Sequence, residues 1–154
     1  MYFCAYHQGS GLLASYFSGA TNQDKDYQTF MEASMTLDQE HQHRPEGVVH
    51  LVVLSAESPR PNATWRAKFA GLSKSFQVKR ILFGFVTTSL LLRGVGRAVT
   101  WLSPPPTHHL IGMHETIPEA ILWSEQHQKR KLPLLPQLFF EIEMRIKKEA
   151  VISL

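Results

Sequence analysis

The chain alternates between apolar runs typical of buried strands and segments whose apolar residues recur every three or four positions. The clearest run is VVHLVVL at Val48–Leu54, which predicts a strand buried on both faces of a parallel sheet. Shorter runs predict further strands at Ile81–Val86 and at about 108–113. Near the start, two short apolar runs on either side of Gly9-Ser10-Gly11 predict a β-hairpin.

Helical spacing fills the segments between these strands. We expect helices over about 23–42, 62–76, 89–103 and 116–129. The order hairpin, helix, strand, helix, strand, helix, strand, helix predicts an α/β fold. Its core is a mixed sheet of about five strands, in which the hairpin is followed by parallel strands joined by crossover helices.

Start signals support these helices. Thr21 or Asn22 can cap the first helix, and Thr116 can cap the helix that contains Pro118 in its first turn. In the helix that follows Ile81–Val86, spacing predicts that one set of side chains faces the sheet, namely Leu91, Val95, Ala98, Val99 and Leu102.

The composition is that of an ordinary globular domain, with 44% hydrophobic and 19% charged residues among 154. The net charge of +3 is scattered along the chain, so we predict no nucleic-acid partner. Cys4 is the single cysteine, which excludes an intrachain disulfide and fits a reducing compartment. No basic leader opens the sequence and no apolar run approaches the roughly 20 residues that span a bilayer, so we expect a cytoplasmic protein without membrane insertion.

The last segment departs from the alternation of strands and helices. Residues 132–154 begin with the apolar link LPLLP and continue into an amphipathic helix at about 137–150. We therefore divide the chain into an α/β domain at 1–131 and a C-terminal helical extension at 132–154. The apolar side of the extension predicts an interface with a partner protein or a second copy, formed by Leu135, Leu138, Phe139, Ile142 and Ile146. The alternative is that this helix folds back on its own sheet.

Polar side chains follow the predicted parallel strands, at the edge where open α/β sheets bind ligands. Helix amino termini lie beside them, so an anion or small ligand is expected there. The candidate residues are Ser58, Arg60, Thr64, Thr88, Ser89 and Arg93. The alternative is that the hydroxyl groups serve as plain helix caps.

No catalytic or metal-binding arrangement is evident. The segment Gly94-Val95-Gly96-Arg97 lacks the ending of a phosphate-binding loop and falls inside a predicted helix. Among the eight histidines the only close groups are His41-Gln42-His43 and His108-His109, and neither has a cysteine or carboxylate partner at zinc-site spacing. We predict no catalytic residue, no metal and no cofactor, so a binding role is favoured over an enzyme.

Several short matches carry a family resemblance over about residues 1–131. They are PNATWR at 61–66 opening one helix, Arg93-Gly94 opening the next, Thr100-Trp101-Leu102 ending it, and EAILW at 119–123. With this order of elements the chain resembles the STAS domain class, the fold of bacterial anti-sigma-factor antagonists and of the cytoplasmic ends of anion transporters. More closely it resembles SpoIIAA-like or STAS-like single-domain bacterial proteins. The resemblance implies a STAS-like domain that regulates a partner protein without catalysis.

One feature of the resembled class is absent from this sequence. Anti-sigma antagonists place a phosphorylatable serine in an Asp-Ser-Ser-Gly-like turn after the central strand. Residues 54–60 read LSAESPR and lack the aspartate, the serine pair and the glycine. We therefore expect no regulated phosphorylation at Ser58 or Thr64. The leading hypothesis is a non-enzymatic interaction module, and the alternatives are a small-ligand or anion-binding module, or an enzyme, at the edge near Ser58 and Thr88.

Overall fold

The computed structural model describes residues 1–19, 22–102 and 104–152. Its strands are β1 (Tyr2–His7), β2 (Leu12–Phe17), β3 (Val48–Leu54), β4 (Ile81–Val86) and β5 (His109–His114). A short 3-10 turn at Gln8–Ser10 joins β1 to β2. The helices are α1 (Gln23–Glu40), α2 (Ala63–Ser75), α3 (Leu90–Leu102), α4 (Ile117–Gln128) and α5 (Leu134–Ile152).

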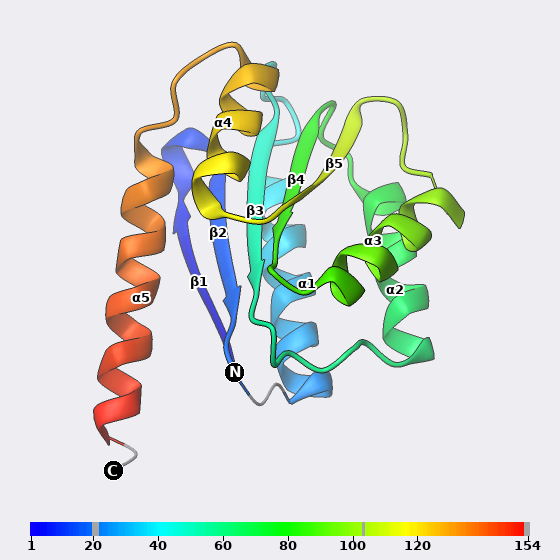
Figure 1. The fold of residues 1–154 in the computed structure, drawn as a ribbon. Coiled ribbons are helices and arrows are strands. Elements are labelled where there is room, and N and C mark those ends of the chain that lie inside the picture. The colour runs from blue at the N-terminus through cyan, green and yellow to red at the C-terminus, as the bar shows by residue number, and fades with distance from the viewer. Residues whose placement is uncertain (20–21, 103, 153–154) are drawn as a thin grey trace.

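The five strands form one sheet in the order β1-β2-β3-β4-β5, which is also their order along the chain (Figure 1). β1 and β2 are antiparallel, and β2 through β5 are parallel. The α/β prediction, with a hairpin followed by parallel strands, is confirmed. The last strand ends one residue later than the sequence predicted, at His114.

The predicted caps at Asn22 and Thr116 are filled as expected, and Asn62 caps a third helix. Asn22 accepts a hydrogen bond from the Lys25 N–H, while the alternative cap Thr21 lies outside the described residues. Asn62 caps α2, where its side-chain oxygen accepts a hydrogen bond from the backbone N–H of Trp65 at 2.9 Å. Thr116 caps α4. Each cap satisfies a backbone N–H that has no partner within its helix.

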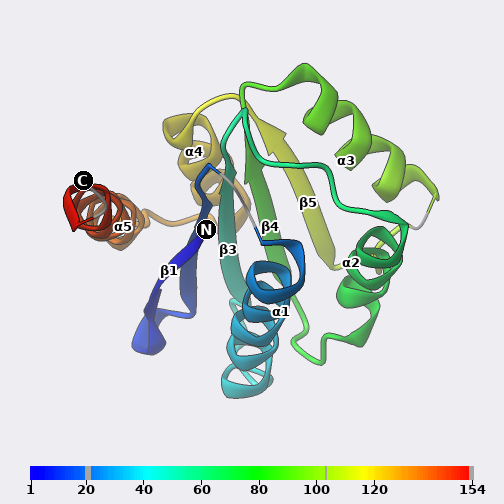
Figure 2. The same ribbon diagram turned by 90° about the horizontal axis from the view of Figure 1, so that it is seen from below.

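The helices lie in two layers, one on each face of the sheet. In Figure 2, α1, α2 and α3 lie on one side of the strands and α4 and α5 on the other. This arrangement follows from the strand order. When parallel strands are added one after another in the same direction, right-handed crossovers bring all their helices to the same face. The opposite face is then covered only by the helices that come after β5.

Each layer closes its own apolar core against the sheet. β3 contributes to both cores because alternate side chains point to opposite faces. One core includes side chains of α4 and α5 and lies against Val49, Leu51, Val53 and Leu82. The other includes side chains of α1 and α2 and lies against Val48, Val52, Ile81 and Phe83.

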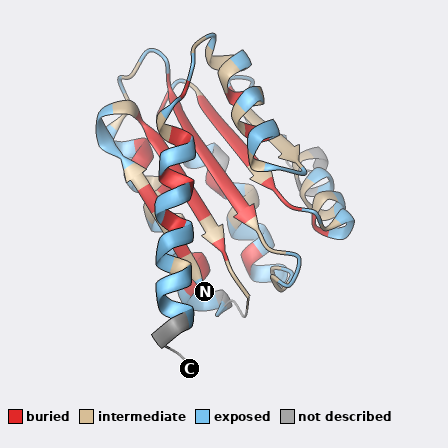
Figure 3. Cartoon of the chain, turned by 60° about the vertical axis from the view of Figure 1, so that its left-hand side comes forward, coloured by how far each residue is buried: buried red, intermediate tan, exposed pale blue. Residues whose placement is uncertain are grey.

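The C-terminal helix packs on its own chain. Leu135, Leu138, Phe139 and Ile142 are buried, with at most 7% of each residue exposed. They belong to the core that α5 shares with β1 and β2. Figure 3 shows the outer side of α5 mostly exposed and the strands behind it buried.

The predicted partner interface on this apolar side is therefore corrected. The chain's own sheet covers four of these side chains, namely Leu135, Leu138, Phe139 and Ile142. Ile146 is partly buried and packs against the same core. The alternative that the helix folds back is the one the structure shows. Residues 132–152 thus complete the core of the domain predicted at 1–131.

A buried histidine organises the polar part of the other core. The His50 imidazole is fully buried between the rings of Phe30 and Phe83. Its Nε2 lies 2.8 Å from the Ser15 hydroxyl and its Nδ1 lies 3.3 Å from the Ser34 hydroxyl. Because the Ser34 hydroxyl donates to the Phe30 carbonyl, Nδ1 carries the proton and Nε2 accepts from Ser15. This chain of hydrogen bonds needs a neutral ring.

Burial lowers the pKa of His50 to about 3. A histidine in the unfolded chain has a pKa near 6.5. Between pH 6.5 and about pH 3, His50 is therefore protonated in the unfolded chain but not in the folded chain. The contribution of neutral, buried His50 to the free energy of unfolding is therefore complete above about pH 6.5 and is lost as the pH falls below that value.

Among the described helices, none combines the length and the apolar character that crossing a bilayer requires.

We predict that His50→Gln reduces the acid sensitivity of folding. Between pH 6 and pH 4.5 the wild-type free energy of unfolding should lose about 1.4 kcal/mol per pH unit through this residue alone. Glutamine retains hydrogen-bonding groups but does not titrate, so the variant should show a shallower slope. Urea unfolding at a series of pH values measures it. Exposed His43→Gln is the matched control and should keep the wild-type slope; equal slopes in all three chains would contradict the prediction.

Candidate functional site

An apolar pocket opens at the carboxyl ends of the parallel strands. It lies between the sheet and the helices α2 and α3, and its volume is about 160 Å³. Strand ends contribute Leu54, Phe85, Thr87 and Met113 to its lining. This is the edge at which ligands bind in open α/β sheets, and where the sequence predicted a binding site.

The lining of the pocket combines two kinds of side chain. One group is aromatic, and its rings are Phe17, Tyr27, Phe30, Phe69, Phe83 and Phe85. Several of these rings meet edge to face, such as Tyr27 and Phe69 with centroids 5.1 Å apart. The other group consists of aliphatic and thioether side chains from α3 and β5, including Leu92, Val95, Ile111 and Met113. The interior is therefore almost entirely apolar.

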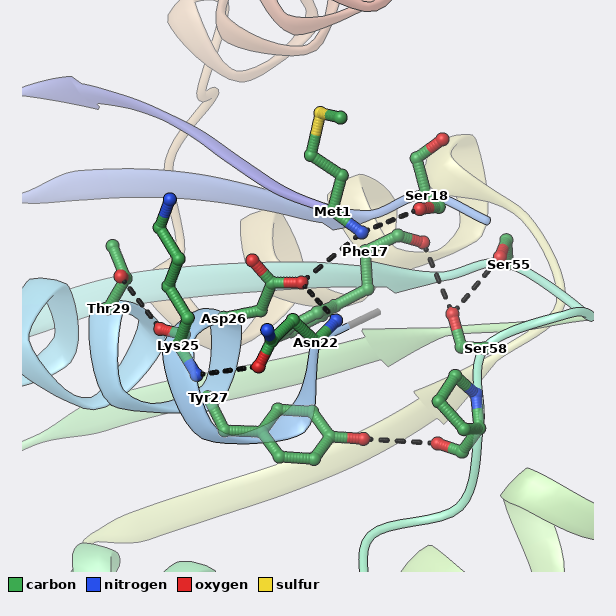
Figure 4. A network of polar contacts seen from close by, with 11 residues as sticks. Met1, Phe17, Ser18, Asn22, Lys25, Asp26, Tyr27, Thr29, Ser55 and Ser58 are labelled. Carbon is green, nitrogen blue, oxygen red and sulfur yellow. Dashed lines mark hydrogen bonds and ion pairs between the residues drawn. The ribbon is translucent and has the colours of Figure 1, made fainter. Parts of the chain in front are cut away.

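Hydroxyl groups near the pocket are engaged within the protein. Ser58 donates to the Phe17 carbonyl at 3.3 Å and lies 3.0 Å from the Ser55 hydroxyl (Figure 4). Tyr27 donates to the Pro59 carbonyl at 3.0 Å. Burial, with a smaller contribution from the Asp26 carboxylate, raises the pKa of Tyr27 to about 12, so the phenol stays protonated as a donor. These bonds fix the loop after β3 across one end of the pocket.

The remaining lining hydroxyls are also directed at backbone groups. Thr100 donates to the Arg97 carbonyl at 2.9 Å, inside its own helix. Thr87 accepts the Ser89 N–H at 3.2 Å. The pocket consequently offers a bound molecule apolar surface rather than a set of convergent donors and acceptors.

One charged side chain lines the pocket among the described residues, and it is Arg66 of α2. Arg66 is exposed and also lines the pocket, which places it where the cavity meets solvent. Its Nη1 donates to the Pro61 carbonyl at 2.8 Å. The guanidinium is thus held beside the loop that precedes α2.

The predicted ligand residues do not converge on one point. Ser58 lines the pocket, whereas Thr64, Thr88 and Arg60 are exposed and do not line it. Ser89 accepts the Leu92 N–H and caps α3, as the alternative reading expected. Arg93 forms an ion pair with Glu115. These six residues line the same edge but form no common anion site.

The face of α3 that lines the pocket differs from the predicted one. Leu92 is buried, while Leu91 is 49% exposed and Ala98 is exposed, so the inward stripe is displaced by about one residue. The predicted inward residue Val95 does line the pocket. The side chains of Val99 and Leu102, also predicted to face inward, lie outside the described part of the structure.

The two glycines of α3 face different surroundings. A Cβ on Gly96 would lie 2.2 Å from the Met113 methyl carbon, so the thioether packs directly on the helix at this point. A Cβ on Gly94 would meet no atom within 4 Å. Gly96 therefore makes room for a side chain of the pocket wall, and Gly94 does not.

A second apolar surface lies on the outer side of α4 and α5. Leu122, Phe140 and Met144 expose 52%, 64% and 51% of their surface. A shallow groove between the two helices is lined by Leu122 and Phe140, with Glu125 and Glu143 among its other residues. We call Leu122, Phe140 and Met144 the outer strip.

Sequence reasoning missed the residues that form the pocket. Phe69, Phe85 and Met113 read as ordinary core positions, because a lining side chain and a core side chain have the same polarity and spacing. Within the described residues, no group of three or more His, Cys, Asp or Glu side chains is arranged to hold a metal ion.

Comparisons of the chain with protein-family models, with curated proteins and with solved structures found no match.

Proposed function

We propose that this chain is a non-enzymatic module that binds a small apolar molecule in the pocket between α2, α3 and the sheet. The observation that carries the proposal is the apolar pocket of about 160 Å³ at the carboxyl edge of the parallel strands. Open α/β sheets bind their ligands at this edge, and binding pockets are largely apolar with few polar groups.

Binding fits the lining better than catalysis does. The residues around the pocket include no His, Asp, Glu, Lys or Cys among those the structure describes. The lining hydroxyls of Ser58 and Tyr27 donate to backbone carbonyls and have no general base beside them in the described lining. An anion in the loops is disfavoured because Arg93 pairs with Glu115 and the hydroxyls serve local turns and caps.

We predict that toluene or n-hexane added to the full chain shifts the NMR signal of the Met113 methyl group saturably. Both molecules are uncharged and small, so their transfer from water into an apolar cavity is favourable. Methyl-labelled methionine provides the signal, and the variant Met113→Leu assigns it. Absence of a saturable shift with either molecule would overturn the proposed function.

Matched glycine variants test whether this shift reports the pocket. Leucine at position 96 must displace Met113 or enter the pocket, whereas leucine at position 94 extends into open space. Gly96→Leu should weaken binding at least about tenfold, because overpacking fills the volume that the ligand needs. Gly94→Leu should bind as the wild type does. Thermal melting of both variants verifies folding, and equal binding by both would place the ligand elsewhere.

A second candidate function is protein association through the outer strip. The resemblance to STAS-like regulators leads us to expect a protein partner, and exposed apolar side chains that cluster on a surface are typical of interaction sites. Leu122, Phe140 and Met144 supply such a cluster on adjacent helices. The proposed association is between two copies of this chain.

We predict that Phe140→Glu weakens self-association without unfolding the domain. Phe140 is 64% exposed, so the substitution leaves the core intact but places a charge in the apolar contact. Sedimentation equilibrium over a range of concentrations measures the effect. Gln39→Glu, which adds the same charge at an exposed position of α1 on the other face of the sheet, is the control. A wild-type chain that stays monomeric at millimolar concentration, or equal association by both variants, would contradict this role of the outer strip.

A further inference from the structure

We infer that the pocket takes a small aromatic carboxylic acid, with its ring in the cavity and its carboxylate at Arg66. This inference rests on the proposed binding function and adds the chemical class of the ligand. Three features of the site carry it: the size of the cavity, the aromatic side chains of its lining, and the one charged side chain in the described lining.

The size of the cavity fits one ring. Its volume of about 160 Å³ is close to that of an engineered cavity of about 150 Å³, in another protein, that is lined by Leu, Ile and Phe and binds benzene. A fused polycyclic ligand would need more room than this. A ring with a short substituent can occupy the cavity while the substituent reaches the opening.

The wall favours a ring over an alkyl chain of similar hydrophobicity. Phe30 and Phe69 already meet edge to face, with centroids 5.7 Å apart and planes at 89°. A bound ring can extend this arrangement, in which the positive edge of one ring contacts the negative face of another. The Met113 sulfur in the same lining adds a polarisable contact that aromatic rings favour. A rigid ring also loses less conformational entropy on binding than a flexible chain.

The polar groups determine where a substituent can go. Ser58, Tyr27 and Thr100 donate to backbone carbonyls, so a polar group on the buried part of the ring would find few partners. Arg66 stands at the opening, and one of its nitrogens is held by the Pro61 carbonyl. Its other N–H groups match the geometry of a carboxylate, and the described lining has no carboxylate that would attract an amine.

The test compares three probes by calorimetry on the full chain. 3-Phenylpropionate carries a ring and a carboxylate, hexanoate replaces the ring by a chain, and 3-phenylpropylamine replaces the carboxylate by an ammonium group. We expect 3-phenylpropionate to bind about threefold to tenfold more tightly than hexanoate, from ring contacts and rigidity. We expect it to bind about twofold to fivefold more tightly than the amine, because one exposed charge pair contributes a factor of about that size.

Variants of α2 assign the carboxylate contact. Arg66→Gln should weaken 3-phenylpropionate about twofold to fivefold and leave toluene binding unchanged. Lys68→Gln removes the same charge from the same helix at a residue whose ammonium lies over the Trp65 ring, 4.0 Å from its centroid, and should have no effect. Equal weakening by both variants would show that the net positive charge of α2, and not a direct contact with Arg66, favours the carboxylate. That result would overturn this part of the inference.

The outcomes separate this inference from the proposed function. If hexanoate or the amine binds as tightly as 3-phenylpropionate while toluene or hexane still shifts the Met113 methyl signal, the ligand class is wrong and the binding pocket stands. If neither the three probes nor the two hydrocarbons bind saturably, both fail. Tight binding of 3-phenylpropionate that Gly96→Leu abolishes and Gly94→Leu preserves would support both.

Discussion

The fold depends on one constraint, which is that the strands lie in the sheet in the same order as in the chain. Sequential right-handed crossovers bring α1, α2 and α3 to one face and leave the other face of β1 through β5 without a helix from any crossover. That face carries Leu12, Val49, Leu51 and Leu82, which are all buried. Covering such side chains is worth about 1.5–3 kcal/mol each. α4 and α5 supply this cover, so neither can be an optional addition.

Local rules predict most of the secondary structure here because the signals are strong and short-ranged. β3 reads as a doubly buried strand from its seven residues alone, and Asn62 and Thr116 act as caps in the way their side chains favour. The order of strands in the sheet has no such local signal. Without that order, a partner protein and the chain's own sheet are equally reasonable contacts for the apolar side of α5, and the predicted contact was the partner.

The apolar pocket illustrates a different limit. The sequence pointed to the edge of the sheet at which the pocket lies, because the ends of parallel strands are recognisable from their apolar runs. The residues predicted there were polar, and the structure uses Ser89 as a cap and Arg93 as an ion-pair partner. The cavity is lined instead by side chains such as Phe69 and Met113, which differ from core residues only in where α3 lies. One local signal was available, namely a glycine at position 96 within an amphipathic helix.

The contact between α5 and the β1–β2 hairpin has a consequence for synthesis of the protein. The hairpin is made before α5, which follows the whole of the parallel sheet along the chain. While a ribosome is still adding α5, the nascent sheet presents Phe3, Ala5 and Leu12 to water on the face that α5 will cover. Contacts between segments so distant in sequence form slowly, and exposed apolar surface invites aggregation. The nascent chain should therefore depend on chaperones until α5 emerges.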